Sequence, residues 1–118
     1  MKTATAALSL CVLFAAANAT LASPADGTLR TTDVVSPNHY IEYRVYLLAG
    51  EPTRIAVRGD GQGDVDLYLF DENGHRIDYD NDYTDTCFAS VTPAWSGNFT
   101  IRVVNAGSIP DQYTITVW

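Results

Sequence analysis

The stretch of sequence that decides the fold class is YIEYRVYLL, residues 40–48. Every second position carries a side chain suited to a core, namely Ile41, Tyr43, Val45 and Leu47. A period of two places side chains alternately on the two faces of a β-strand, whereas an amphipathic helix repeats every 3.6 residues. No helical period is visible from Thr28 onward. The stretch therefore predicts a strand with one buried face in a chain built from strands.

The same alternation recurs on both sides of this stretch, interrupted by turn residues. We expect further strands at residues 29–34, 53–57, 64–70, 75–79, 86–92, 99–104 and 113–117. Asn73-Gly74 predicts a tight primed hairpin turn, because these residues tolerate positive φ angles. Seven or eight short antiparallel strands at this spacing predict an all-β fold, a single jelly-roll-like β-sandwich. A closed barrel of the same strand count is the alternative.

The N-terminus has the pattern of an export signal. Lys2 precedes an apolar stretch over residues 6–17, which is too short to span a bilayer. Small residues favour cleavage after Ala22, with Ala19 as the alternative site. Cys11 follows Leu10 inside the apolar stretch and does not fit a lipid anchor. We therefore expect a signal peptide over residues 1–22 and a single domain over residues 23–118, secreted or periplasmic.

Charge narrows the range of partners. The 118 residues include fourteen acids and seven basic residues, and the single lysine, Lys2, lies in the expected signal. The mature chain then holds six arginines and fourteen acids, which gives a net charge of 6 − 14 = −8. Such a chain repels nucleic acid and anionic membranes. We expect a soluble monomer with neither as a partner, which leaves cations, neutral polymers and proteins.

Five sequence motifs resemble the bacterial pre-peptidase C-terminal domain, a β-sandwich often appended to exported enzymes. The resemblance spans residues 40–117, and its motifs are YRVYLLAG (43–50), GDVDLYL (63–69), Tyr79-Asp80, GNFTIRV (97–103) and Tyr113-Thr114-Ile115. It implies a non-catalytic accessory or binding module. Family members commonly have a disulfide-bonded cysteine where Asn81 stands, so the resemblance implies that this bridge is missing. We expect no catalytic domain beside the module.

Acidic residues are concentrated in one part of the chain. Nine of the fourteen acids lie between Asp60 and Asp85. Asp64 and Asp66 are two apart on one expected strand and so project from the same face. Hard oxygen ligands suit calcium. We therefore expect calcium as the cofactor, with metal ligands drawn from Asp60, Asp64, Asp66, Asp78, Asp80 and Asp82. The alternative is a solvated acidic face with aspartates that cap their own turns.

The residues that catalysis requires are scarce. His39 and His75 are the only histidines, and neither has a metal-ligand spacing, so both are expected to be structural or exposed. A glycoside hydrolase could use Asp64 with Asp66 or Asp80. A domain of this size without a deep cleft makes that reading the weakest of those considered. We therefore expect no enzyme.

Cys87 and the aromatic residues complete the candidates. Cys87 alternates with Ala89 and Val91, which predicts a buried thiol; a reactive or dimer-forming thiol is the alternative. Trp95 lies in a turn, and the tyrosines expected to face outward are Tyr40, Tyr46, Tyr68, Tyr79 and Tyr83. If these rings line up, they form a binding face.

Three functional readings follow. The leading one is a secreted, non-catalytic module, stabilised by calcium, that binds an extracellular polymer such as a polysaccharide or a partner protein. The alternative is a calcium-binding structural protein with no other ligand. A small hydrolase is the third.

Overall fold

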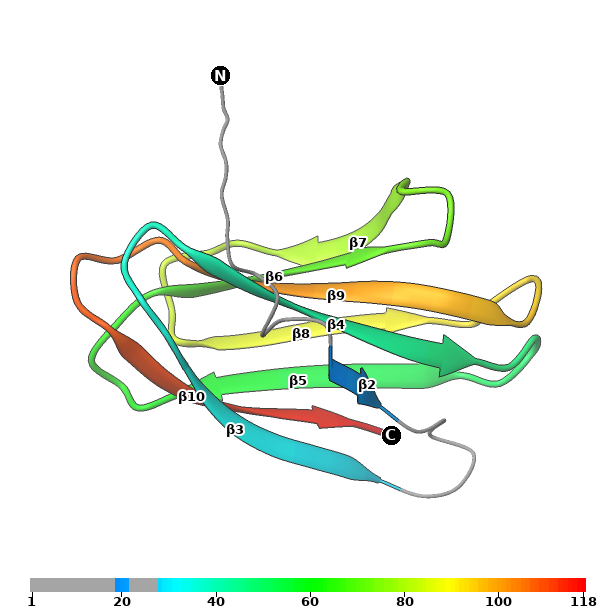
Figure 1. The fold of residues 1–118 in the computed structure, drawn as a ribbon, viewed down its shortest axis with the longest axis horizontal. Helices are drawn as coiled ribbons and strands as arrows, with labels where there is room; N and C mark the ends of the chain where they lie inside the picture. The colour runs from blue at the N-terminus through cyan, green and yellow to red at the C-terminus, as the bar shows by residue number, and fades with distance from the viewer. Residues whose placement is uncertain (1–18, 22–27) are drawn as a thin grey trace.

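The protein is a sandwich of two β-sheets (Figure 1). The structure is a computed structural model, and it describes residues 19–21 and 28–118. One sheet has the strand order β3-β10-β5-β8 and the other β2-β4-β9-β6-β7. The strand bounds are β2 Ala19–Leu21, β3 Leu29–Val35, β4 Tyr40–Leu47, β5 Thr53–Gly59, β6 Val65–Phe70, β7 Arg76–Asp80, β8 Thr86–Val91, β9 Gly97–Asn105 and β10 Asp111–Val117.

The core lies between the sheets and follows the predicted alternation. Tyr43, Val45 and Leu47 of β4 are buried, and every second residue of the other core strands joins them. Ile41 and Val91 are partly buried and pack against this core. The all-β sandwich is therefore confirmed, and the closed barrel is excluded because the strands form two separate sheets. In the described part of the chain no helix is long and apolar enough to span a bilayer.

The structure differs from the sequence prediction at the β6–β7 hairpin. The return strand is Arg76–Asp80, one residue later than expected. Gly74 has φ 83°, but Asn73 does not take a positive φ, so the turn is not the primed two-residue type. The Asp71 carboxylate instead accepts hydrogen bonds from the amides of Asn73 and His75, both at 2.9 Å. This aspartate widens the turn and shifts the start of β7.

Strand β2 was not predicted. Ala19–Leu21 pairs in parallel with β4, with Ala19 opposite Tyr43 and Leu21 opposite Val45. These residues fall within the expected signal peptide, which was expected to be removed. The remainder of that signal, residues 1–18 and Ala22, lies outside the described residues, as does the start of the expected mature domain. Cleavage after Ala22 would leave β4 as an edge strand.

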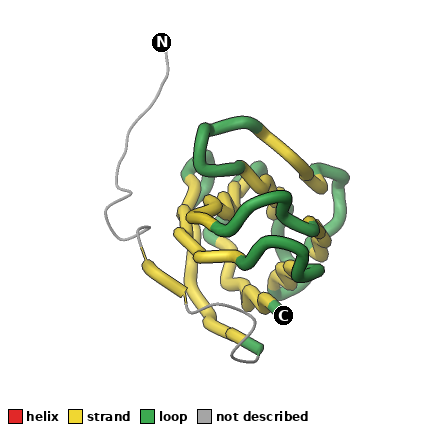
Figure 2. The backbone as a smooth tube through the Cα atoms, turned by 90° about the vertical axis from the view of Figure 1, so that its right-hand side faces the viewer, coloured by secondary structure: helices red, strands yellow, loops and turns green. Residues whose placement is uncertain are grey.

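The antiparallel topology gathers the loops at the two ends of the sandwich. The β3–β4, β5–β6, β7–β8 and β9–β10 loops meet at the left end of Figure 1, called the acidic end below. Figure 2 looks at the opposite end, where loops cover the strand ends near the C-terminus. Segments that are distant in the sequence are therefore neighbours at each end.

A pair of buried tyrosine hydroxyls joins the two sheets within the core. Tyr43 of β4 and Tyr113 of β10 are 2% and 1% exposed, and their hydroxyl oxygens lie 2.6 Å apart. Burial raises the pKa of Tyr43 to about 12 and raises the pKa of Tyr113 further. Each hydroxyl is the other's partner, so the pair satisfies two polar groups that would otherwise be buried at a cost.

We expect Tyr43→Phe to lower the free energy of unfolding by about 1–3 kcal/mol, because it leaves the buried Tyr113 hydroxyl without a partner. The double variant Tyr43→Phe/Tyr113→Phe should lose less than the sum of the two single variants, since no hydroxyl is then orphaned. Urea unfolding of the four proteins measures this coupling. Strictly additive losses would show that the hydroxyl pair has no energetic role.

Candidate functional site

Most carboxylates of the acidic segment bind backbone amides. Between Asp60 and Asp85, six of the nine acids accept a hydrogen bond from a main-chain N–H: Asp60, Asp71, Asp78, Asp80, Asp82 and Asp85. Turns and strand ends leave such amides without a backbone partner, and aspartate side chains supply one. Most of the acids in this segment therefore have a structural role, which is to bind backbone amides.

Asp78 and Asp80 link the two sheets. Both lie on β7, and their carboxylates accept hydrogen bonds from the amides of Ser90 at 2.9 Å and Phe88 at 3.0 Å on β8. β8 is the edge strand of the other sheet, so these amides face away from β5. The two aspartates thus close part of an open sheet edge, and one oxygen of each is engaged there. The expected role of both as calcium ligands finds no support in this geometry.

Asp82 caps a turn. Its Oδ1 accepts hydrogen bonds from the Thr84 amide at 2.9 Å and the Thr84 hydroxyl at 2.7 Å. These two bonds hold the pKa of Asp82 below its ordinary value, with the hydroxyl contributing most. This is the turn-capping role expected as the alternative to metal binding.

Asp64 and Asp66 lie near each other, as the alternation predicted, but they have few partners. Each has one buried carboxylate oxygen, Oδ1, without a hydrogen bond. Partial burial, together with the charges of Asp64, Asp82 and Asp80 in that order, raises the pKa of Asp66 to about 6. The described residues bring no third acid within chelating distance of this pair. The Asp66 carboxylate is therefore partly buried, close to other acids, and without a hydrogen-bond partner for Oδ1.

A different set of carboxylates converges at the acidic end. Asp60, Asp85 and Asp111 place one oxygen each within 4.8 Å of one another, the only such group in the described part of the chain. Asp60 was among the predicted ligands, but Asp85 and Asp111 were not. Burial and the adjacent Asp85 carboxylate raise the pKa of Asp111. Two carboxylate charges at this separation repel by roughly 3.5 kcal/mol at an effective dielectric constant of 20.

The second feature is a row of aromatic and arginine side chains on the outer face of the five-stranded sheet. Register places Glu42, Arg102, Tyr68 and Tyr79 opposite one another across β4, β9, β6 and β7. We define the aromatic–arginine face as Tyr40, Tyr68, Phe70, Tyr79, Arg76 and Arg102. Of the tyrosines expected to face outward, Tyr40, Tyr68 and Tyr79 therefore line up.

Guanidinium groups organise this face. Arg102 Cζ lies 4.6 Å from the ring centre of Tyr40 and 4.7 Å from that of Phe70. Its guanidinium also bonds the Glu42 carboxylate, with 2.7 Å between Nη2 and Oε2. Arg76 Cζ lies 4.4 Å from the Tyr79 ring, which stacks on Tyr68 at 6.2 Å. These contacts fix side chains that would otherwise be mobile.

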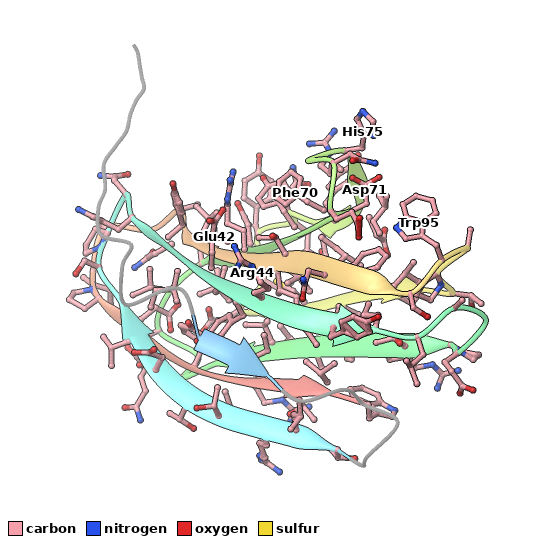
Figure 3. The ribbon with its side chains drawn as sticks, turned by 45° about the vertical axis from the view of Figure 1, so that its right-hand side comes forward. Glu42, Arg44, Phe70, Asp71, His75 and Trp95 are labelled. Atoms are coloured by element: carbon pink, nitrogen blue, oxygen red, sulfur yellow. The ribbon has the colours of Figure 1, made fainter. Side chains whose placement is uncertain are left out.

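The face continues toward the β6–β7 hairpin. Figure 3 shows Glu42, Arg44 and Phe70 on this side of the sheet, with Asp71 and His75 on the hairpin. Gly97 is flanked by Trp95 of the β8–β9 loop and by Glu72 of the hairpin. The Trp95 side chain is 43% exposed. Tyr46 is also exposed on the outer side of β4. Tyr83, by contrast, is 95% exposed on the β7–β8 loop, away from the sheet.

The outer face of the four-stranded sheet carries a shallow groove. Arg30, Arg58, Phe88 and Trp118 help to line it, and its volume is about 420 Å³. Phe88 is 58% exposed, so this groove is a second apolar surface. It lacks the aligned ring and guanidinium contacts of the aromatic–arginine face.

The remaining candidates have structural roles. Cys87 is fully buried, as predicted, and its thiol donates to the Val65 carbonyl at 3.0 Å. Burial raises the pKa of Cys87 to about 12, so the thiolate is suppressed. His39 lies 2.8 Å from the Pro37 carbonyl through Nδ1. His75 is exposed, and its Nδ1 lies 3.4 Å from an Asp71 carboxylate oxygen.

We expect Asp78→Ala to lower the free energy of unfolding by about 2 kcal/mol, because the Ser90 amide loses a charged acceptor. Asp78→Asn keeps an acceptor oxygen and should lose about half as much. Hydrogen exchange of the Ser90 amide should accelerate in the alanine variant, and urea unfolding gives the stabilities. Equal behaviour of the two variants would show that the hydrogen bond does not stabilise the β8 edge.

The pKa of Asp66 predicts a pH dependence. A carboxyl with a raised pKa in the folded protein stabilises the fold below its unfolded pKa, and that contribution is lost as pH rises through about 6. Asp66→Asn should therefore be more stable than wild type at pH 7 and show no gain at pH 3.5. The difference between 3.8 and about 6 corresponds to about 3 kcal/mol. Solvent screening of this half-exposed group reduces the expected gain to about 1 kcal/mol.

Thermal unfolding in a chelator at both pH values measures this effect. A gain of about 1 kcal/mol raises the melting temperature by about 4–8 °C for a domain of this size. An equal difference between variant and wild type at pH 3.5 and pH 7 would contradict the assignment to the Asp66 charge.

Comparison with known proteins identifies the fold. No protein-family model and no curated protein sequence matches the chain. The pre-peptidase C-terminal domain of a Bacillus anthracis collagenase superposes with a TM-score of 0.66 at 15% identity, covering 86% of this chain and 94% of that domain. PliG from Aeromonas hydrophila, a periplasmic inhibitor of g-type lysozyme, gives 0.59 at 17% identity, with 84% and 94% covered.

A third similar structure is CorA, a surface-associated copper-binding protein from Methylomicrobium album BG8. Its TM-score is 0.62 at 9% identity, and the match covers 86% of this chain and 98% of CorA. Identities this low establish a common fold and nothing beyond it. The chain thus has the β-sandwich fold of the pre-peptidase C-terminal domain, which the sequence resemblance predicted.

Proposed function

We propose that this protein is an exported, non-catalytic binding module that holds a partner protein on its aromatic–arginine face. The observation that carries the proposal is the alignment of Arg102, Tyr68 and Tyr79 across adjacent strands. Export rests on the signal predicted at residues 1–22.

The composition of the face suits a protein interface. Tyrosine and arginine are enriched among the residues that contribute most to protein–protein binding. Here the Arg76 and Arg102 guanidinium groups are already packed on rings, and Glu42 anchors Arg102. Side chains that are ordered before binding lose less conformational entropy when a partner docks. Pairing of β4, β9, β6 and β7 in one sheet fixes the backbone positions from which these side chains project.

The same contacts favour a protein over a polysaccharide. A sugar ring stacks on an uncovered aromatic face, but Arg76 lies over Tyr79, and Arg102 lies against both Tyr40 and Phe70. Within the described residues Arg44 and Arg76 form no ion pair, so both can reach carboxylates of a partner. A polymer ligand is the second outcome that the experiment below tests.

Proteins of this fold supply a precedent. PliG from Aeromonas hydrophila is an inhibitor of g-type lysozyme, so a sandwich of this kind can act by binding a protein. Its identity to this chain is 17%, and the partner does not transfer with the fold. We propose protein binding as the role, without naming the partner. The partner is the protein whose binding requires the aromatic–arginine face.

The proposal is tested by affinity capture with matched variants. The immobilised protein is exposed to periplasmic and culture-supernatant proteins of the source cells, and in parallel to insoluble polysaccharides. We expect a retained protein that is lost with Tyr79→Ser and with Arg76→Ala. Binding constants of the purified partner should weaken at least tenfold in either variant, as for a residue central to an interface.

Two variants control for exposed aromatic residues elsewhere. Tyr83→Ser removes a ring that is 95% exposed but off the face, and Phe88→Ser alters the groove on the other sheet. Both should bind as wild type does. Retention that depends on Phe88, or that survives the loss of Tyr79 and Arg76, would refute the proposed face. Retention on a polysaccharide alone would refute a protein ligand.

A further inference from the structure

Three aspartates from separate parts of the sequence converge at the acidic end. Asp60 follows β5, Asp85 precedes β8 and Asp111 begins β10. One oxygen of each lies within 4.8 Å of the others. β10, β5 and β8 are adjacent in the four-stranded sheet, so the carboxylates meet where three neighbouring strands end.

Asp111 is the unusual member of this group. It is 0% exposed, and neither of its carboxylate oxygens has a hydrogen-bond partner of good geometry. Buried carboxylates are normally paired with a cation or with several donors. Asp85 does have donors, since it accepts from the Gly61 amide at 2.8 Å and from the Val65 amide at 3.3 Å. The orphaned oxygens of Asp111 therefore favour a positively charged ligand.

Two glycines leave room for the carboxylates to converge. A Cβ at Gly59 would collide with the Asp85 carboxylate, and a Cβ at Gly63 would collide with that of Asp111. The three carboxylates lie at increasing depth: Asp60 is exposed, Asp85 is half-buried and Asp111 is buried. The group therefore extends from the surface at Asp60 to the buried carboxylate of Asp111.

We propose that Asp60, Asp85 and Asp111 bind one divalent cation, and that the cation is calcium. Three carboxylates offer hard oxygen ligands, which calcium takes in flexible geometry together with water or backbone carbonyls. Magnesium requires a near-ideal octahedron and loses water reluctantly. Zinc and copper favour nitrogen and sulfur ligands, and the group contains neither. This site shares Asp60 with the ligand set expected from sequence spacing, adds Asp85 and Asp111, and is independent of the proposed binding face.

The ion would stabilise the acidic end of the sandwich. It would hold the ends of β5, β8 and β10 together, and the Asp85 bond to the Val65 amide extends this link to β6 in the other sheet. A dication also neutralises most of the negative charge of three close carboxylates. Calcium binding should therefore stabilise the fold.

Calorimetric titration and thermal unfolding of the purified protein test the site. After treatment with a chelator, calcium should bind with a stoichiometry of one and raise the melting temperature by about 10 °C at a hundredfold excess over Kd. Magnesium should raise it less. Asp60→Asn and Asp111→Asn should each weaken calcium binding at least tenfold, while Glu51→Gln, an exposed acid elsewhere, should bind as wild type does.

Asp111→Asn gives the sharpest comparison, because its effect on stability should change sign. In chelator it should be more stable than wild type, since it removes a buried charge beside Asp85; in calcium it should be less stable. Asp66→Asn should keep the full calcium response. Equal melting temperatures of wild type in calcium and in chelator would overturn the proposal. A calcium response that survives Asp60→Asn and Asp111→Asn but disappears in Asp66→Asn would also overturn it.

Discussion

A β-sandwich leaves backbone amides unpaired at every turn and along every open edge, and in this protein aspartate carboxylates pair with many of them. Asp71 holds the β6–β7 turn, Asp82 holds the following loop, and Asp78 and Asp80 cover the β8 edge. An uncovered edge strand invites pairing with another chain. The loops and the outer faces of the two sheets keep their arrangement because of these hydrogen bonds between side chains and the backbone.

This constraint explains why the acidic segment is dense without being a single metal site. Carboxylates that accept backbone amides are stabilised as anions, as the lowered pKa of Asp71 and Asp82 shows. Neither Asp66 Oδ1 nor either oxygen of Asp111 accepts a well-formed hydrogen bond, and burial raises the pKa of each residue. The same residue type therefore has two roles, set by whether an N–H points at it. Carboxylates of the second kind gain most from a nearby cation, because no amide stabilises their charge.

The sequence predicted the fold and the buried faces because a period of two acts locally along each strand. It did not predict that Asp85 and Asp111 lie beside Asp60, because spacing along one strand does not show which strand ends meet. A signal was present, however: Asp85 shares the parity of the buried Cys87 and Ala89, and Asp111 that of the buried Tyr113 and Ile115. An aspartate in the inward register of a core strand is costly without a partner. Pairing those two positions required the β10–β5–β8 order, which alternation cannot supply.

Strand β7 connects the structural role of the aspartates with the proposed binding face. Asp78 and Asp80 turn inward to bond β8, so the residue between them, Tyr79, must point outward beside Tyr68. A slip of one residue would bury Tyr79 and expose both carboxylates. The hydrogen bonds that close the β8 edge therefore also set the orientation of the ring on which Arg76 packs. Edge protection and the alignment of the face follow from one register.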